Sequence, residues 1–292
     1  MTVGSFTAKR LKVVITLADD SNTVFDSSGN NTLTIETLRM TATTVIANRQ
    51  ASQLDLKIFG MRAQDMDALT SAWMDSNSIR DNRVELFADD GGGYKPVFKG
   101  TVIEAQPLYK LVPDVPFQIL GMICYFNAIE KADPLSYKGS VSIKTIGQDL
   151  AIKLKLSFDS HGVDGITLNN PNYPGTVLDQ LRDVCYDAKV DFYFQGDTLV
   201  FAPVEKPFDS NPTVIVSPSS GLIGYPQYSR RGLVVTALYD SAYLCGSAIE
   251  IRDSAVKGAN GRWYPFSAQF DLSANMPRGS WMATLQCNKA GI

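Results

Sequence analysis

The sequence predicts a mainly β protein with an α+β insert, in which two small antiparallel β-barrels flank a unit of two helices and a hairpin. Three observations predict this class. Apolar residues alternate with a period of two near both ends of the chain, they follow a helical period in the middle, and four prolines within residues 203–218 favour an extended connection. We expect an N-terminal β-barrel over residues 1–130, an α+β unit over 131–205 and a C-terminal β-barrel over 206–292.

Length and composition indicate a folded chain with more than one folding unit. The chain has 292 residues, of which 45% are hydrophobic and 20% are charged. These values exclude a wholly disordered, collagenous or coiled-coil protein. The 27 Lys and Arg residues against 30 Asp and Glu residues give a net charge of -3. Without a basic surplus, sequence-specific binding of nucleic acid is not expected.

Cysteine spacing and hydropathy indicate the compartment. The four cysteines form no C-x-x-C pair and are widely spaced, at Cys124, Cys185, Cys245 and Cys287. Buried free thiols are therefore expected. Residues 13–18 are too short an apolar stretch for a secretory leader, and no segment reaches the roughly 18 apolar residues of a membrane span. We expect the chain to be made and to fold in a reducing cytoplasm.

The first unit is expected to hold six or seven strands and one helix. Alternation places on one face the residues Leu11, Val13, Ile15 and Leu17, then Leu33 and Ile35, then Leu54, Leu56 and Ile58. The Asp- and Asn-rich stretch 19–31 predicts a loop. Met66, Leu69 and Trp73 have helical spacing; Asp65 is the expected cap, and 76–78 ends the helix.

A hairpin and one more strand complete this unit. Alternating residues at 84–86 and 97–103 are separated by 89–93, where three consecutive glycines allow the positive φ of a tight reversal. The last strand is expected to carry Phe117, Ile119, Gly121, Ile123 and Tyr125.

The middle and last units follow from similar patterns. Ser142 is expected to cap a helix with the apolar stripe Ile143, Ile146, Leu150 and Leu154. After a loop at 169–175, Thr176 and Asp179 resemble a capping box, with Asp where Glu is usual, and a second helix is expected to carry the stripe Val177, Leu181, Val184, Cys185 and Ala188. A hairpin covers 191–201. Strands resume at 233–239 and 249–251, Asn260-Gly261 predicts a tight hairpin, and 262–270 and 281–287 complete the chain.

Motifs that carry chemistry are absent, so no catalytic, cofactor-binding or metal-binding residue is assigned and no cofactor is expected. The only histidine, His161, lies among Gly and Asp residues that mark a turn, and no G-x-S-x-G motif occurs. Residues 26–37 begin like an EF-hand but lack its glycine and final glutamate, and 91–93 lack the P-loop frame. A distant pair of carboxylates would leave no sequence signal, so that possibility stays open.

Four aromatic residues near the C-terminus allow two interpretations. Trp263, Tyr264, Phe266 and Trp281 could line a groove for a glycan or a peptide, or they could pack in the core. Core packing is favoured because consecutive residues of a strand point to opposite faces. The pair Arg230-Arg231 is read as a solvated strand entrance.

The order of several short motifs resembles a known family. Residues 217–226 (SPSSGLIGYP), 259–263 (ANGRW) and 279–281 (GSW) resemble the C-terminal barrel of phage baseplate hub proteins, the central tail-tip hub of contractile-tailed phages, with a late control protein D-like pattern. Residues 169–176 (NNPNYPGT) and 199–203 (LVFAP) are similar to the middle domain of that family, and 56–60 (LKIFG) to its N-terminal domain. One departure is Gln269, where a histidine is common in the family.

The resemblance implies a structural, non-enzymatic virion protein made in the host cytoplasm. Three chains with two barrels each would form a pseudo-sixfold ring that adapts a hexameric tail tube to a trimeric tail spike and lines the DNA channel. The implied partners are two further copies in a homotrimer, the spike, the tail tube or distal tube protein, and also the tape measure and baseplate wedge proteins. The slightly acidic chain suits a channel through which DNA slides, because like charges repel.

Two other functions stay open at this point. A glycan-binding tail module requires exposed Trp263 and Trp281. A hub-associated peptidoglycan hydrolase requires a role for His161 or nearby acids. If the chain is a hub, contacts with neighbours are expected at strand edges and at the loops 19–31, 89–94 and 253–260.

Overall fold

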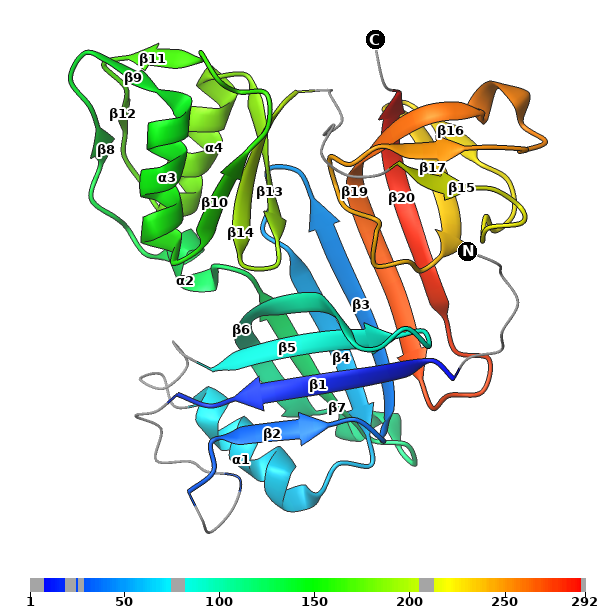
Figure 1. Cartoon of the computed structure of the whole chain (residues 1–292). Helices are drawn as coiled ribbons and strands as arrows, with labels where there is room; N and C mark the ends of the chain where they lie inside the picture. The colour runs from blue at the N-terminus through cyan, green and yellow to red at the C-terminus, as the bar shows by residue number, and fades with distance from the viewer. Residues whose placement is uncertain (1–7, 19–24, 26–28, 75–81, 205–212, 290–292) are drawn as a thin grey trace.

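The computed structural model describes residues 8–18, 25, 29–74, 82–204 and 213–289 (Figure 1). The N-terminal part contains β1 (Arg10–Thr16), β2 (Thr32–Ile35), β3 (Arg39–Ala47), β4 (Gln53–Phe59), α1 (Ala63–Met74), β5 (Arg83–Asp89), β6 (Lys95–Pro107), the 3-10 helix η2 (Tyr109–Leu111) and β7 (Pro116–Met122). The middle part contains α2 (Tyr125–Ile129), β8 (Leu135–Ser136), β9 (Ser140–Ser142), α3 (Ile143–Leu154), β10 (Ser157–Ser160), β11 (Thr167–Asn169), β12 (Asn172–Tyr173), α4 (Val177–Asp187), β13 (Val190–Gln195) and β14 (Thr198–Pro203). The C-terminal part contains β15 (Val214–Val216), β16 (Gln227–Ser229), β17 (Gly232–Leu238), β18 (Ile249–Ile251), the 3-10 helix η3 (Lys257–Ala259), β19 (Gly261–Ala274) and β20 (Trp281–Lys289).

One large sheet joins the two ends of the chain. Its thirteen strands follow the path β16-β17-β20-β19-β3-β4-β7-β6-β5-β1-β2, with β18 beside β19 and β15 beside β18. The junction is the antiparallel pair β3 and β19, whose register runs from Ser267 opposite Ala47 to Ala274 opposite Met40. In Figure 1 these two strands lie next to each other in the centre of the molecule. The first and last parts of the chain therefore share a continuous hydrogen-bonded ladder.

The strand predictions agree with the observed burial. Every second side chain of β1, β4 and β17 is buried, as the alternation requires. The fully buried side chains on these strands include Leu11, Val13, Ile15, Leu56, Ile58, Val235 and Ala237. They belong to one hydrophobic cluster that takes residues from both β-rich parts. The mainly β class is confirmed.

The middle part forms a second cluster around α3 and α4. Ser142 caps α3 by accepting a hydrogen bond from the Thr145 backbone N–H, and Thr176 and Asp179 form the predicted capping box of α4. The stripes of the two helices pack on the hairpin β13–β14, whose Phe192, Phe194, Leu199 and Phe201 complete this second cluster. Both helices and the hairpin are confirmed.

The hairpin β13–β14 is buried on both faces, and this attaches the middle part to the large sheet. While Phe192 and Phe201 face the helices, Tyr193, Val200 and Ala202 belong to the cluster of the large sheet. A strand covered on both sides is expected to be continuously apolar. The sequences VDFYFQ and TLVFAP fit this rule apart from the buried Asp191 and the half-buried Gln195 and Thr198 next to the turn.

Arg49 forms the ion pair that makes the burial of Asp191 possible. Its guanidinium Nε lies 2.6 Å from Asp191 Oδ1, its Nη2 donates to the Val190 carbonyl at 3.2 Å, and its backbone N–H donates to the Phe192 carbonyl at 3.0 Å. Arg49 sits in the turn between β3 and β4 with a φ of 58°. The buried carboxylate of Asp191 thus ties the middle part to that turn.

The large sheet is open, so the two closed barrels expected from the sequence are not found. Its path begins at β16 and ends at β2, and in the described part of the chain these two end strands do not pair with each other. The long β19 explains the difference. One edge of β19 pairs first with β18, over Gly261–Trp263, and then with β3, over Ser267–Ala274, while the other edge pairs with β20. The strand is shared by both halves and leaves neither closed on itself.

Several local predictions need correction. The strand from Phe117 ends at Met122, and Tyr125 begins α2 instead, after Cys124 turns the chain at a φ of 54°. Asp65 is not the cap of α1: the helix begins at Ala63, and the Asp65 carboxylate pairs with Arg62 at 2.8 Å. The loop at 169–175 contains the short strand β12, which pairs with β8.

The Asn260-Gly261 hairpin is also wrong. The connection from β18 to β19 spans nine residues, 252–260, and contains η3. Asn260 instead organises this loop, because its Oδ1 accepts from the Ser254 N–H at 2.9 Å and its Nδ2 donates to the Ser254 carbonyl at 3.2 Å. The expected helix end at 76–78, most of the loop 19–31 and most of the proline-rich connection lie outside the described residues.

Gly232 should be hard to replace. A Cβ atom added there would lie 2.1 Å from the Cys287 carbonyl oxygen, and the φ of this residue is +130°. We expect Gly232→Ala to lower the free energy of unfolding by about 2 kcal/mol or more, measured by urea denaturation. Gly60→Ala is the control, since it has a φ of +79° with no atom within 4 Å of the added Cβ. Equal losses for both variants would contradict the steric explanation.

Removing the Arg49 side chain should loosen the middle part. Arg49→Ala leaves the buried carboxylate of Asp191 without its ion pair, which we expect to cost about 1–3 kcal/mol in urea denaturation. Cleavage by a protease within residues 125–203 should also become faster. Arg252→Ala is the control, because its ion pair with Glu250 at 2.7 Å lies away from this turn and the Arg252 side chain is about half exposed. A similar decrease in the free energy of unfolding in both variants would show that the Arg49–Asp191 ion pair does not stabilise the protein more than an exposed pair.

Candidate functional site

Three surface features stand out: a polar sheet face, an apolar sheet edge and a cavity where the three parts of the chain meet. The polar face is made by the side chains that alternate with the core residues along the strands around the β3–β19 junction. On β3, β4, β7, β19 and β20 it carries Thr41, Thr43, Asp55, Lys57, Gln118, Gln269, Asp271, Ser273, Thr284 and Gln286. Threonine, serine and amide side chains predominate among its polar residues, and the apolar Val45, Leu120 and Met282 lie on the same face.

The carboxylates of the polar face are paired with neighbours on the same face. Thr43 Oγ1 donates to Asp271 Oδ1 at 2.8 Å across the β3–β19 junction, and Gln269 Nε2 donates to Asp271 Oδ2 at 2.9 Å. Gln118 Nε2 donates to Asp55 Oδ1 at 2.8 Å, and Lys57 Nζ lies 3.5 Å from Asp55 Oδ2. The Thr43–Asp271 and Gln118–Asp55 bonds cross between strands, and the first of them joins the two halves of the sheet, so the polar face continues over both halves.

The apolar edge lies along β16 and β17, at one end of the sheet path. Its four large side chains are unusually exposed for apolar residues: Ile223 36%, Tyr225 70%, Tyr228 62% and Leu238 43%. Ladder contacts hold them in place, since the Ile223 N–H donates to the Thr236 carbonyl and the Leu238 N–H donates to the Gly221 carbonyl, both at 2.8 Å. Exposed apolar residues along a free sheet edge are typical of surfaces that another chain covers.

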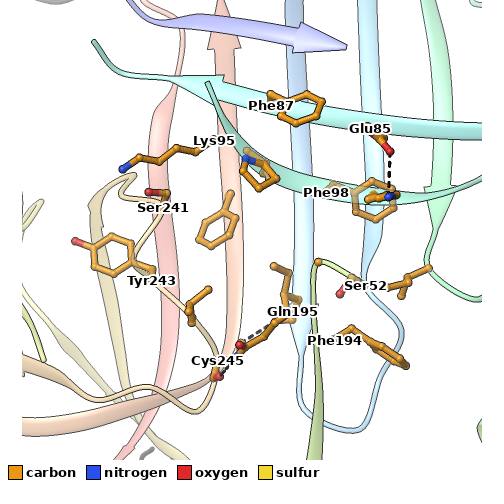
Figure 2. A pocket seen from close by; sticks show the side chains of 18 of the residues that line it. Ser52, Glu85, Phe87, Lys95, Phe98, Phe194, Gln195, Ser241, Tyr243 and Cys245 are labelled. Atoms are coloured by element: carbon orange, nitrogen blue, oxygen red, sulfur yellow. Dashed lines mark hydrogen bonds and ion pairs between the residues drawn. The ribbon is translucent and has the colours of Figure 1, made fainter. Parts of the chain in front are cut away.

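The junction cavity has a volume of about 600 Å³. Its walls come from β5 and β6, from the β13–β14 turn and from the loop after β17, and its aromatic lining is Phe87, Phe98, Phe194, Tyr239, Tyr243 and Phe270. Figure 2 shows Phe98 and Lys95 along one wall, Tyr243 and Ser241 on the second, and Phe194 and Gln195 on the third. Burial raises the pKa of Tyr239 and of Tyr243, so both hydroxyls stay protonated and can donate hydrogen bonds at neutral pH.

Polar contacts connect the walls of the junction cavity. Lys99 Nζ lies 2.7 Å from Asp197 Oδ2 and 3.3 Å from Glu85 Oε1, and its hydrogen bond to Asp197 raises the pKa of Lys99. Gln195 Nε2 donates to the Cys245 carbonyl at 3.3 Å, as Figure 2 also shows. Each of the three parts of the chain thus contributes one wall, and the walls are tied together by side chains.

The residues singled out from the sequence lie elsewhere. His161 follows β10, where its Nε2 lies 3.2 Å from Asp159 Oδ2, and it belongs to none of the three features. Trp263, Tyr264, Phe266 and Trp281 are all buried, as the core interpretation predicts. Arg231 is exposed and stacks on the Phe266 ring at 4.8 Å. Among the sequence candidates, Gln269 alone contributes to the polar face.

Within the candidate contact loop 89–94, and at the cysteines, the observed contacts are those of ordinary parts of the fold. Asp89 accepts hydrogen bonds from the Gly91 and Gly93 amides at 2.7 and 2.9 Å, and the Gly91 bond lowers the pKa of Asp89. All four thiols are free; Cys124 is half-buried and the other three are buried. Burial raises the pKa of Cys124 to about 12, which leaves this thiol inert at neutral pH.

Within the described ranges, no group of three or more His, Cys, Asp or Glu side chains is placed to hold a metal ion. Within those ranges there is also no helix that is both long enough and apolar enough to cross a bilayer. Sequence reasoning missed the polar face, the apolar edge and the junction cavity. The polar face had a signal in the polar residues that alternate with the apolar ones, but the cavity depends on contacts between distant segments.

Solved structures with the same fold are phage tail and secretion proteins. A tail protein from Neisseria meningitidis MC58 superposes with a TM-score of 0.65 at 12% identity, covering 97% of both chains. The 43 kDa tail protein of prophage MuSo2 from Shewanella oneidensis gives 0.62 at 9% identity, covering 95% of this chain and 98% of that one. A component of the type VI secretion system of E. coli gives 0.60 at 7% identity, with 95% and 77% covered.

Curated protein sequences give no match. The decisive comparison is with a family model described as baseplate hub gp41, which matches residues 10–279. This match spans the large sheet from β1 to the β19–β20 turn together with the whole middle part. The chain therefore belongs to the baseplate hub gp41 family of phage tail structural proteins.

Proposed function

We propose that this chain is the central hub of a phage baseplate, in which three copies form a pseudo-sixfold ring that adapts a hexameric tail tube to a trimeric tail spike and lines the DNA channel. The observation that carries the proposal is the polar face that continues across the β3–β19 junction. Two sheet halves per chain supply six halves in a trimer, which is the number that a sixfold tube requires. In this proposal the units 1–130 and 206–292 form the ring, and the unit 131–205 lies outside it.

The polar face suits the wall of a DNA channel. Its acids, Asp55 and Asp271, accept hydrogen bonds on the face itself, and its lysine, Lys57, lies beside Asp55. DNA binds nonspecifically where lysine and arginine displace counterions from its phosphates. A wall of threonine, serine and amide side chains with paired charges offers little such attraction, so DNA can slide past it.

The apolar edge is the proposed contact between neighbouring copies. A head-to-tail contact that repeats around a threefold axis closes into a ring and covers the same edge on every copy. Burial of Tyr225 and Tyr228 would remove large apolar surfaces from water, each worth about 1.5–3 kcal/mol when complete. The N-terminal half of the next copy is the proposed partner of this edge.

The remaining partners follow from the place of a hub. The ring would contact the spike on one side and the tail tube or distal tube protein on the other, with the tape measure and baseplate wedge proteins as further neighbours. Synthesis in the host cytoplasm and a purely structural, non-enzymatic role belong to the same proposal.

The glycan-binding alternative loses its basis because Trp263 and Trp281 are 4% and 6% exposed. A hydrolase role for His161 finds no support in a residue that lies outside all three surface features.

Charge placed on the apolar edge should prevent assembly of the ring. We expect the purified chain to behave as a trimer in light scattering after size exclusion, at three times its mass of 31.9 kDa. Tyr225→Glu combined with Tyr228→Glu should shift it to the monomer, because buried unpaired carboxylates are strongly unfavourable. Tyr186→Glu is the control, since Tyr186 is 73% exposed on α4. A trimer that survives the double change would remove this edge from the interface.

Lysines placed on the polar face should slow DNA passage without affecting assembly. Gln269 and Thr284 are opposite each other on β19 and β20. The double change Gln269→Lys with Thr284→Lys adds two positive charges to each chain and six to a ring of three chains. We expect DNA delivery by complemented virions to fall at least about tenfold, because phosphates would bind the wall. Gln269→Asn with Thr284→Ser should leave delivery unchanged. Normal delivery by the lysine variant, with normal tails in electron micrographs, would contradict the channel assignment.

A further inference from the structure

The connection between β6 and β7 carries a compact group of exposed apolar side chains. This connection, residues 108–115, contains η2 and is called the β6–β7 tip. Tyr109 is 65% exposed, Leu111 53% and Val112 74%. Among the side chains that the structure describes between β1 and β7, no other large apolar one is as exposed. Apolar side chains that gather on a surface in this way are typical of a contact with another chain.

The β6–β7 tip has a defined shape. The Leu108 N–H donates to the Pro116 carbonyl at 2.9 Å, and the Leu111 N–H donates to the Leu108 carbonyl at 3.1 Å. An ion pair between Asp114 Oδ2 and Arg39 Nη2, at 3.0 Å, connects the tip to the start of β3. A surface that is already ordered loses little conformational entropy when it binds, so this tip is well suited to a specific contact.

The ladders place the β6–β7 tip and part of the apolar edge at the same end of the sheet. Leu238, the last residue of β17, pairs with Met282 near the start of β20. β19 ends where β3 begins, and Figure 1 shows the start of β3 and the β19–β20 turn at the lower end of the sheet. Phe59 of β4 is opposite both Arg39 of β3 and Pro116 of β7, so β7 begins at this end as well. The tip and Leu238 therefore lie at the same level along the strands.

The β6–β7 tip and the apolar edge also lie on opposite sides of the polar face. The sheet path runs from β17 through β20, β19, β3 and β4 to β7 and β6. A head-to-tail contact joins two different surfaces of the same chain, one from each side. Rotation about an axis that runs along the strands keeps each surface at its own level. The tip of one copy is therefore at the level of Leu238 on the next copy.

We propose that the β6–β7 tip of one copy covers the lower part of the apolar edge of the next copy, with Leu111 and its neighbours against Ile223 and Leu238. Ile223 and Leu238 are close together at that edge, because the Ile223 N–H donates to the Thr236 carbonyl and the Leu238 N–H to the Gly221 carbonyl. The inference rests on the ring proposed above and names the segment of the N-terminal half that makes the contact.

A second copy is the fitting partner because the two surfaces match in chemistry as well as in level. Both surfaces are apolar, so pairing them removes both from water at once. Their charges are also complementary: the exposed Lys110 stands beside Leu111, and Asp240 follows Leu238 by two residues. Opposite charges beside an apolar contact favour one register of the two copies over others.

Cross-linking of the full chain tests which residues meet. Leu111→Cys combined with Leu238→Cys, treated with a short bismaleimide, should give at least about tenfold more covalent trimer than either single variant, because each interface of a closed ring then holds one cysteine of each kind. The native thiols contribute little, since three are buried and burial raises the pKa of Cys124 to about 12. Within one chain the two positions lie on opposite sides of the sheet, so products between chains are expected.

Matched variants define the outcomes of the cross-linking. Tyr186→Cys combined with Leu238→Cys is the control, since Tyr186 is exposed on α4, and it should give no covalent trimer. Equal yields from the two pairs, or no covalent trimer from the first pair, would overturn the proposal. A covalent dimer from Leu111→Cys alone would show that the tip meets its own copy in a twofold contact, and this too would make the proposal wrong.

A charge on the β6–β7 tip should weaken the ring. Leu111→Asp is expected to raise the concentration at which half of the chains are trimeric at least about tenfold in light scattering, because an unpaired carboxylate would be buried. Ile152→Asp, at an exposed position on α3, should leave that concentration unchanged.

Failure of this contact is distinguishable from failure of the hub assignment. If Leu111→Asp leaves the trimer intact while the glutamates at Tyr225 and Tyr228 disperse it, the tip is not the partner of the apolar edge and the ring stands. An intact Leu111→Asp trimer that no longer supports tails in electron micrographs would assign the tip to another tail protein and contradict this proposal. A chain that is monomeric at every concentration would also overturn it, while the hub assignment is judged separately by DNA delivery.

Discussion

The antiparallel ladder between β3 and β19 is the constraint on which the rest of the structure depends. It pairs residues 40–47 with residues 267–274, which are more than two hundred positions apart in sequence. Because the ladder fixes the register, it places the core residues Met40, Ala42, Phe270 and Leu272 on one face of the sheet and Thr41, Thr43, Asp271 and Ser273 on the other. One buried cluster and one polar face then extend over both ends of the chain, and neither half needs to close on itself to bury its apolar side.

The middle part depends on this arrangement through the β13–β14 hairpin. Since the hairpin is covered on both faces, it can be stable only where the large sheet supplies the second cover. Arg49, in the β3–β4 turn, and Lys99, on β6, fix the hairpin at its two ends through Asp191 and Asp197. The Lys99–Asp197 pair also connects two walls of the junction cavity, so the cavity results from the way the parts are joined.

Much of this fold could be predicted from local patterns, and the errors have physical causes. The capping residues Ser142 and Thr176 and the alternation around Leu11 and Leu56 are local signals, and the structure confirms them. The two closed barrels are not found because closure depends on which strands pair, and the pairing of β19 with β3 has no signature in hydropathy. The tight hairpin predicted at Asn260-Gly261 is wrong because the Asn260 side chain hydrogen-bonds Ser254 within a longer loop.

The polar face could have been found by reading the polar half of each alternation, whereas the cavity joins three distant segments. The hub family itself was recognised from the order of short motifs.

The shift at Pro265 and Ser267 also determines how this region can change during evolution. Side chains downstream of it alternate strictly, so a deletion of one residue within β19 would exchange its two faces and turn Phe270 and Leu272 toward water. The same deletion in the turn at 275–280 would be absorbed where no ladder is present. Insertions and deletions should therefore be filtered out along β19 and collect in the adjoining turn, while exchanges among small polar residues accumulate on its outer face. Divergent relatives can thus share the backbone while they retain little sequence identity.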